Sequence, residues 1–185
     1  MRYAKLYAGA LLTLCLSIPA TAQQKSGMVL TSPAFTDGTD IPQRFTQHDP
    51  GHPVSPKLAW TNVPDGTASF VLIFHDMEVS IQKRLEDSLH WIIFNIPGTA
   101  HELAEGIPRI ATLPDGTVQP MNPRGHYGYR GPGAVMPPRH HYTFELYALD
   151  TTLALNTEAT RAEVLRAVEG HILGKAILMG LYHRR

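Results

Sequence analysis

Four polar side chains at the ends of apolar segments could together bind a small charged ligand. His140 and Tyr142 are two residues apart, so in an extended strand they share one face and lie about 7 Å from each other. His90 begins a second apolar segment, and Asp76 follows a third at the point where we expect a loop to start. Imidazole, phenol and carboxylate groups supply the charge-assisted hydrogen bonds that hold small anions.

Each of these residues also has an ordinary structural explanation. A histidine at the end of a strand is commonly hydrogen-bonded to its surroundings, and a tyrosine can pack in the core with its hydroxyl at the surface. An aspartate in a loop commonly bonds its own backbone and caps a turn. Strand alternation alone cannot bring three distant segments together, so the pattern defines a candidate site only.

Other chemistries have less support. The sequence contains no Gly-x-Ser-x-Gly elbow, no phosphate loop and no His-Glu-x-x-His pair. His75 and Asp76 with His90 and His140-His141 could hold a metal, but their spacing matches no known metal motif, so we expect no metal or other cofactor. Because no activated nucleophile is evident, we favour a binding or modulatory protein over an enzyme. The alternative is an ester or phosphoester hydrolase that uses His140 or His90 as its base.

The distribution of apolar and turn-forming residues predicts a mainly β fold. The clearest strands are Ser69–Phe74, Leu89–Ile96, His141–Leu149 and Lys175–Tyr182. The continuous apolar run from Phe70 to Phe74 indicates a strand that is covered on both faces. Two long stretches without a regular pattern, Thr36–Pro56 and Ile107–Pro138, are typical of functional loops.

Strand alternation also predicts which side chains share a face. In the strand after Pro138, one face carries His140, Tyr142, Phe144 and Leu146. In the second strand, one face carries His90, Ile92, Phe94 and Ile96. Each set combines polar residues at the start of the strand with an apolar remainder.

One helix is expected around Glu158–Glu169. Thr157 can cap its start, and Thr160 with Glu163 resembles a capping box one turn later. An apolar stripe for packing is formed by Val164, Leu165 and Val168.

Residues 1–22 have the features of a secretory signal peptide. Arg2 and Lys5 provide a positive start, the apolar stretch Leu6–Ile18 follows, and small residues end the segment. The apolar stretch is shorter than the roughly 20 residues of a membrane-spanning helix. We therefore expect a periplasmic or secreted protein in which residues 23–185 form a single domain without a transmembrane segment.

The charge of the exported chain argues against nucleic acid as a partner. Removal of residues 1–22 leaves 14 basic residues against 16 acidic ones, and therefore a net charge of −2 with neutral histidines. Nucleic-acid-binding proteins rely instead on a strongly basic face. The only cysteine, Cys15, leaves with the signal peptide, so we expect no disulfide or thiol chemistry.

Several segments, in order, resemble the phosphatidylethanolamine-binding protein family, also called kinase-inhibitor-like, and most of all its bacterial branch. The matching segments are Ser55–Pro64, Phe70–Glu78, His90–Pro97, Gly128–Pro132, His140–Tyr142, Leu146–Asp150 and Gly170–Tyr182, and they span roughly residues 28–185. The resemblance implies a large antiparallel sheet packed against a smaller sheet, with one or two helices. It also implies a shallow pocket for small anions, including the phosphate of a phospholipid head group.

The same resemblance assigns ligand binding, position by position, to Asp76, His90, Gly131, Pro132, His140 and Tyr142. Gly131 and Pro132 would form a wall of the pocket. The resemblance further implies that the protein could inhibit a protein target, and that it could form a homodimer.

Two departures from the family pattern concern this pocket. The family's Asp-Pro-Asp turn is replaced by Asp76-Met77-Glu78, and the loop between Pro132 and His140 is about one residue longer than usual. If protonated imidazoles of His90 and His140 donate to the anion, its binding should weaken as the pH rises.

Overall fold

The structure is a computed structural model in which residues 27–80, 85–134 and 138–184 are described. Its strands are β1 (Val29–Thr31), β2 (Thr39–Asp40), β3 (Leu58–Thr61), β4 (Ser69–Ser80), β5 (Asp87–Pro97), β6 (Glu102–Leu103), β7 (His140–Leu149) and β8 (Ile172–Tyr182). A 3-10 helix, η1 (Gln43–Phe45), and an α-helix, α1 (Arg161–Val168), complete the regular elements of these ranges. The predicted signal peptide at residues 1–22 lies outside the described residues.

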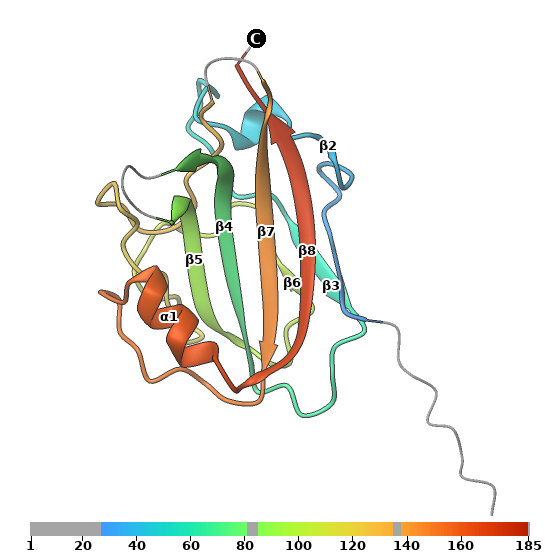
Figure 1. Ribbon diagram of the computed structural model, residues 1–185, viewed down its shortest axis with the longest axis vertical. Helices are drawn as coiled ribbons and strands as arrows, with labels where there is room; N and C mark the ends of the chain where they lie inside the picture. The colour runs from blue at the N-terminus through green and yellow to red at the C-terminus, as the bar shows by residue number, and fades with distance from the viewer. Residues whose placement is uncertain (1–26, 81–84, 135–137, 185) are drawn as a thin grey trace, which may run out of the picture.

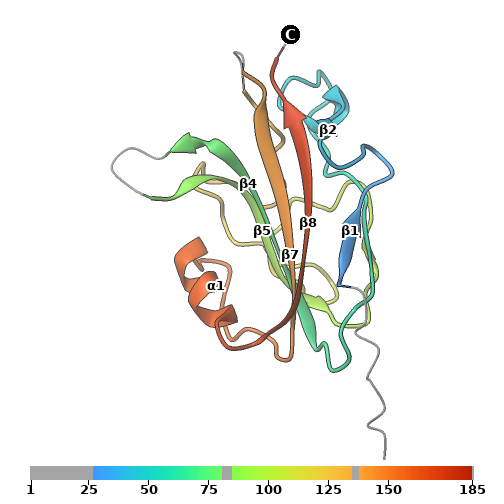
Figure 2. The same ribbon diagram turned by 45° about the vertical axis from the view of Figure 1, so that its right-hand side comes forward.

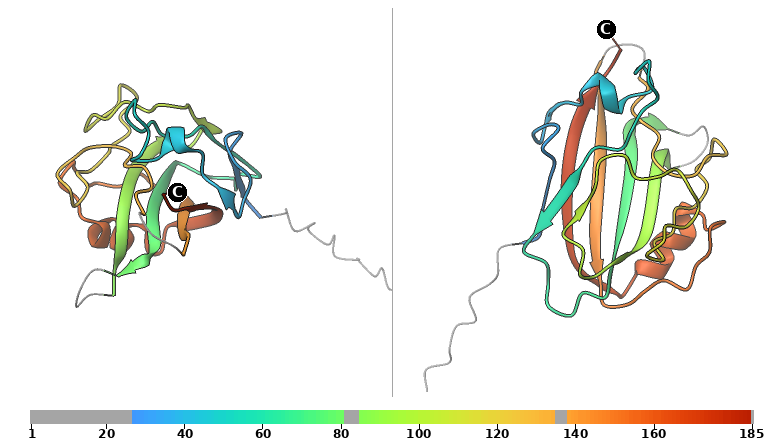
Figure 3. Two further views of the ribbon diagram at one scale, coloured as in Figure 1. Left: turned by 90° about the horizontal axis from the view of Figure 1, so that it is seen from above. Right: turned by 180° about the vertical axis from the view of Figure 1, so that it is seen from behind.

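The strands form two sheets. The larger has the strand order β2-β8-β7-β4-β5 and the smaller has the order β1-β3-β6. Paired strands are antiparallel except for β2 and β8, which run parallel. Figures 1 and 2 show α1 on one side of the large sheet and the small sheet on the other, and in the view from behind β3 crosses in front of the large sheet (Figure 3). The predicted mainly β fold with two packed sheets is confirmed.

The inner strand β4 is buried on both faces because it is apolar at every position from Phe70 to Phe74. Phe70, Leu72 and Phe74 belong to a core that also includes residues of the small sheet. Val71 and Ile73 belong to a second core, which packs under α1. The prediction that this strand is covered on both faces is confirmed.

The predicted strands are present, and each extends beyond its expected bounds at one end or both. The extension of β4 to Ser80 corrects one expectation, since Asp76 lies inside the strand and not at the start of a loop. Asp76 is paired with Tyr142 of β7 on one side and with Ser88 of β5 on the other. The site residues of these strands are therefore neighbours by register.

The predicted face of β5 is wrong because the strand contains a bulge at His90. Phe74 of β4 pairs with Trp91, but the next residue, His75, pairs with Leu89, so His90 is an extra residue. An extra residue breaks the alternation of side chains. His90 consequently packs edge-on against the rings of Phe74 and Tyr142, whereas Ile92 and Phe94 belong to the core under α1. A second register shift, opposite Phe70 and Leu72, returns Ile96 to the core of Phe74 and Tyr142.

The helix begins three residues later than predicted. Thr160, not Thr157, is its N-cap: the Thr160 side chain accepts from the backbone of Glu163, and the Glu163 side chain accepts from the backbone of Thr160. The capping box is therefore confirmed at its predicted residues. Of the predicted stripe, Val164 and Val168 are buried, while Leu165 is exposed.

Candidate functional site

A cavity of about 370 Å³ lies where β4 ends and β5 and β7 begin. Asp76, His90, His140 and Tyr142 all line it, so the structure brings together the four polar residues that the sequence singled out. The remaining lining residues are Gln47, Val79, Ser88, Arg124, Arg130, Gly133 and Ala134. The β4–β5 and β4–β7 pairings hold the three strands in register at this end of the sheet.

Asp76 and His140 form a hydrogen-bonded pair in the cavity. The Nδ1 of His140 lies 2.9 Å from Oδ2 and 3.1 Å from Oδ1 of Asp76, whose side chain is almost completely buried. An ionised carboxylate only accepts hydrogen bonds, so His140 carries a proton on Nδ1. The pair fixes the orientation of the imidazole ring. Its Nε2 accepts a hydrogen bond when His140 is neutral and donates one when His140 is protonated.

His90 is oriented by backbone carbonyls and not by a carboxylate. Its Nδ1 donates to the carbonyl oxygens of Arg130 at 2.9 Å and Gly131 at 3.1 Å. Burial, together with the nearby guanidinium of Arg130, lowers the pKa of His90 to about 4. The ring is therefore neutral near pH 7, and its Nε2 carries a lone pair. The sequence suggested that a protonated or polarised His90 donates to an anion; the lowered pKa disfavours the protonated form, and neutral His90 can accept from a ligand that carries a proton.

Tyr142 anchors the loop that closes the cavity. Its hydroxyl accepts backbone N–H bonds from Gly133 at 3.2 Å and Ala134 at 3.1 Å. Burial raises the pKa of Tyr142 well above its usual value, so the hydroxyl stays protonated. Tyr142 thus positions the loop.

Gly131 and Pro132, the predicted wall, are not among the residues that line the cavity, whereas the next two residues, Gly133 and Ala134, are. The Gly131 carbonyl accepts from Gln47 at 2.7 Å as well as from His90. A Cβ at Gly131 would lie 2.4 Å from the carbonyl oxygen of Phe45, so only glycine fits there. Residues 135–137, which belong to the lengthened part of this loop, lie outside the described residues.

Sequence reasoning missed two arginines that line the cavity, Arg124 and Arg130. The Nη2 of Arg130 donates to Ser88 Oγ at 3.1 Å and to the Leu89 carbonyl at 3.4 Å, which ties the loop to β5. Burial and the positive charge of Arg124 lower the pKa of Arg130, but a guanidinium stays charged at any physiological pH. Both residues lie in the loop of aromatics, glycines and prolines, and this composition was the available signal.

The replaced turn, Asp76-Met77-Glu78, is part of an irregular end of β4. The pairing of β4 with β5 is interrupted between Asp76 and Ser80, and the backbone N–H of Glu78 donates to Asp76 Oδ1 at 3.1 Å. Ligand atoms of Asp76, Glu78 and His140 lie within 4.8 Å of one another, close enough for a metal ion. Asp76 and His140 already bond each other, however, and Glu78 bonds the side chain and backbone of His141.

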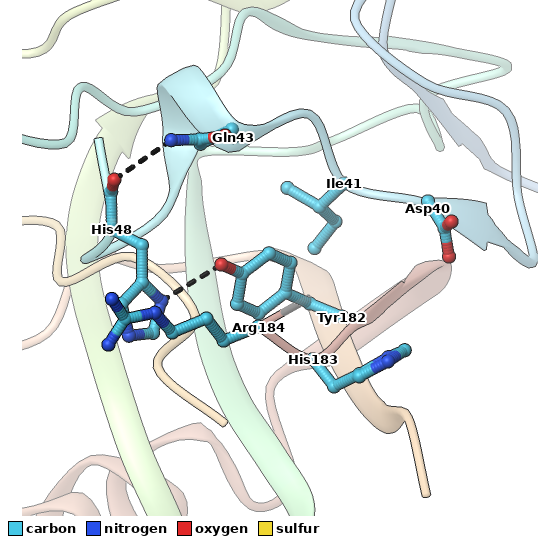
Figure 4. Close-up of a pocket in the computed structure, with 7 residues that line it drawn as sticks. All are labelled: Asp40, Ile41, Gln43, His48, Tyr182, His183 and Arg184. Carbon is cyan, nitrogen blue, oxygen red and sulfur yellow. Dashed lines mark hydrogen bonds between the residues drawn. The ribbon is translucent and has the colours of Figure 1, made fainter. Parts of the chain in front are cut away.

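A second, larger cavity of about 570 Å³ lies beside the end of β8. Figure 4 shows His48 and Tyr182 at its centre, where His48 Nδ1 lies 2.9 Å from the Tyr182 hydroxyl and Gln43 donates to the His48 carbonyl. Burial and the charge of Arg184 lower the pKa of His48. The backbone N–H of Arg184 donates to the carbonyl of Ala134, so the two cavities share a wall.

The chain matches the family model described as phosphatidylethanolamine-binding protein over residues 31–183. It is 45% identical over 159 residues to a UPF0098 protein of Methanothermobacter thermautotrophicus, covering 85% of this chain and 99% of the relative. A UPF0098 protein of Chlamydia trachomatis is 38% identical over 161 residues, with 85% and 99% covered.

Solved structures agree with this match. The crystal structure of a phosphatidylethanolamine-binding protein homolog from Chlamydia trachomatis has a TM-score of 0.73 at 36% identity, covering 86% of this chain and 99% of that one. E. coli YbcL, described as a member of the mammalian phosphatidylethanolamine-binding protein family, has a TM-score of 0.75 at 26% identity, covering 86% and 100%. No helix among the described residues is long and apolar enough to cross a membrane. The sequence, the fold and these relatives together show that the chain belongs to the phosphatidylethanolamine-binding protein family.

Proposed function

We propose that the protein binds a small phosphate-type anion in the cavity at the end of β4, either free phosphate or the phosphate of a head group. The observation that carries the proposal is the convergence of an oriented histidine, His140, and a half-buried arginine, Arg130, on one cavity. The two residues come from different segments, and each is held by its own hydrogen bonds. Cationic donors fixed in this way bind an oxyanion without first having to be ordered.

The roles of the lining residues follow from their protonation. His140, backed by Asp76, donates from Nε2 when it is protonated, and an approaching anion favours that protonated form. Arg130 supplies a permanent positive charge. His90 accepts from whatever proton the ligand carries, such as a P–OH, a hydroxyl or an ammonium group. Binding should therefore weaken as the pH rises, because a neutral His140 does not donate from Nε2.

Titration of the protein with inorganic phosphate and with phosphoethanolamine, followed by NMR shifts and calorimetry, tests the proposal. Both ligands should shift resonances of the β4, β5 and β7 ends, and His140→Ala should weaken binding about tenfold or more, because a charge-assisted hydrogen bond is lost. His171→Ala is the matched control, since His171 also pairs with a carboxylate, that of Asp150, but on the exposed surface. Unchanged affinity in His140→Ala would contradict the proposal.

We propose binding rather than catalysis because the cavity offers no activated nucleophile among its described residues. The Tyr142 hydroxyl accepts two N–H bonds, and the Ser88 hydroxyl accepts from Arg130. A hydrolase is the alternative, because neutral His140 backed by Asp76 could act as a base toward water. Turnover of a phosphoester and ester panel that disappears in His140→Ala would establish that alternative.

We also propose that the protein acts after export to the periplasm or the medium, as the composition of residues 1–22 supports. N-terminal sequencing of the protein from its own cell fractions tests this. A chain beginning near Gln23 outside the cytoplasm is expected, and an intact N-terminus in the cytoplasm would contradict export.

A further inference from the structure

The two arginines that line the cavity, Arg124 and Arg130, form no ion pair with a carboxylate of the described residues. Ion pairs elsewhere in these ranges compensate the basic residues Arg44, Lys57, Arg139, Arg161 and Lys175. Arg124 and Arg130 instead lie near each other, close enough for the charge of Arg124 to lower the pKa of Arg130. Two like charges beside a concave surface attract an anion and repel each other without one.

Arg130 is also incompletely hydrogen-bonded. Its Nη2 is tied to Ser88 and Leu89, but its Nε is buried and has no acceptor in the described part of the chain. An unpaired buried donor is costly, and the cost is greater for a charged group. The guanidinium therefore retains hydrogen-bonding capacity toward an oxyanion that enters the cavity.

The other charged groups of the cavity compensate this pair only in part, through the charge of Asp76. The one carboxylate that lines it, Asp76, bonds to His140, and His90 is neutral near pH 7. The lining therefore carries one net positive charge when His140 is neutral and two when an anion holds His140 in its protonated form. Glu78, just outside the cavity, is engaged with His141.

Building on the proposed function, we propose that Arg130 and Arg124 make the cavity selective for doubly charged phosphate groups, as in free phosphate and phosphate monoesters, over singly charged phosphodiesters. A dianion supplies one negative charge for each of the two guanidinium groups, whereas a diester supplies one charge for both. The natural ligand is then a free phosphate or a phosphorylated small molecule, and the diester of an intact phospholipid is the poorer ligand.

The test compares methyl phosphate with dimethyl phosphate, which differ in charge but share the phosphate centre. At pH 7.5 the wild-type chain should bind methyl phosphate at least about tenfold more tightly, the order expected for one additional charge-assisted bond. Arg130→Gln should remove most of this preference by weakening methyl phosphate more than dimethyl phosphate. Arg124→Gln should have a smaller effect, because this side chain is exposed. Arg166→Gln, on the exposed side of α1, is the matched control and should change nothing.

A second comparison uses the titration of the ligand. Phosphate monoesters lose their second proton near pH 6, so methyl phosphate is mostly singly charged at pH 5. The preference over dimethyl phosphate should therefore disappear at pH 5. Both ligands are measured at the same pH, so any change in the charge of Asp76, Glu78, His90 or His140 acts on both affinities. Such a change does not by itself create or remove a preference between the two ligands.

Each outcome decides between the proposals. Equal affinity of wild type for both ligands, or equal weakening of both by Arg130→Gln, would overturn the charge selection while leaving anion binding intact. Binding of neither ligand would reject the proposed function itself. Arg130→Lys is a second variant in case the glutamine variant fails to fold. It keeps the positive charge, so it should keep a preference for methyl phosphate. A folded lysine variant without that preference would also overturn the selection.

Discussion

Two consecutive residues of β4, His75 and Asp76, each form a histidine–carboxylate pair, but on opposite faces of the large sheet. Asp76 pairs with His140 in the cavity. His75 pairs with Asp87 at 2.5 Å on the side of α1, where Arg161 of the helix also bonds Asp87. The two pairs have the same chemistry and adjacent positions in the chain.

The faces differ in how their charges are compensated. On the helix face, Arg161 and His75 surround Asp87 and lower its pKa despite its burial, so the positive and negative groups are matched within the protein. On the cavity face, neither Arg124 nor Arg130 forms an ion pair with a described carboxylate, and among these carboxylates only the nearby charge of Asp76 acts to raise the pKa of Arg130. The comparison teaches that a histidine–carboxylate pair does not by itself mark a binding site, and that uncompensated charge beside a cavity is the more informative feature.

The helix face offers the largest expected effect on stability. Asp87→Ala would leave Arg161 and His75 partly buried without their partner, at a cost of about 3 kcal/mol in the free energy of unfolding. Chemical denaturation measures this loss, which should shrink below about pH 4 as Asp87 itself becomes protonated in the wild type. Phosphate affinity should not change in the folded variant. A loss of affinity equal to that of His140→Ala would show that the two faces are not independent.

The next largest effect is expected on the cavity face, where His90 should make the free energy of unfolding sensitive to acid. Its folded pKa of about 4 lies below the ordinary 6.5, so the unfolded chain binds the extra proton and stability falls as the pH drops from about 6.5 to 4. The expected loss is about 2 to 3 kcal/mol between pH 7 and pH 4. His90→Gln should remove this part of the pH dependence of unfolding. An unchanged acid limb in the variant would mean that His90 is not the neutral acceptor described above.

The smallest expected effect concerns the capping box of α1. Thr160→Ala removes the side-chain acceptor for the Glu163 N–H and should cost about 1 kcal/mol of stability. Thermal unfolding measures the loss, and Thr157→Ala is the control, because Thr157 does not cap the helix. Phosphate affinity should again be unaffected, and equal destabilisation by both changes would contradict the assigned cap.

Most strands of the large sheet could be predicted because continuous apolar runs indicate buried strands. The run Phe70–Phe74 indicated a strand that is covered on both faces. The alternation from Tyr142 onward correctly indicated which side chains of β7 face the core. The bulge at His90 could not be predicted, since it depends on how β5 pairs with β4. The helix start moved because Asn156 first forms a turn, in which its side chain caps Glu158 and its carbonyl accepts from Ala159.

The site was predictable in part for the same reason. Asp76, His140 and Tyr142 lie on strands with clear periodicity, and their positions relative to one another follow from the register. Arg124 and Arg130 lie in a loop without periodicity, so no sequence pattern indicates that they face the cavity. Resemblance to a family did not identify them either, because it drew attention to Gly131 and Pro132.

A crystal structure of the protein grown with inorganic phosphate tests the central claim most directly. We predict one phosphate in the cavity at the end of β4, with its oxygen atoms within hydrogen-bonding distance of the Arg130 guanidinium and of His140 Nε2. A cavity without phosphate, with the anion bound instead between His48 and Arg184 beside the end of β8, would contradict the account.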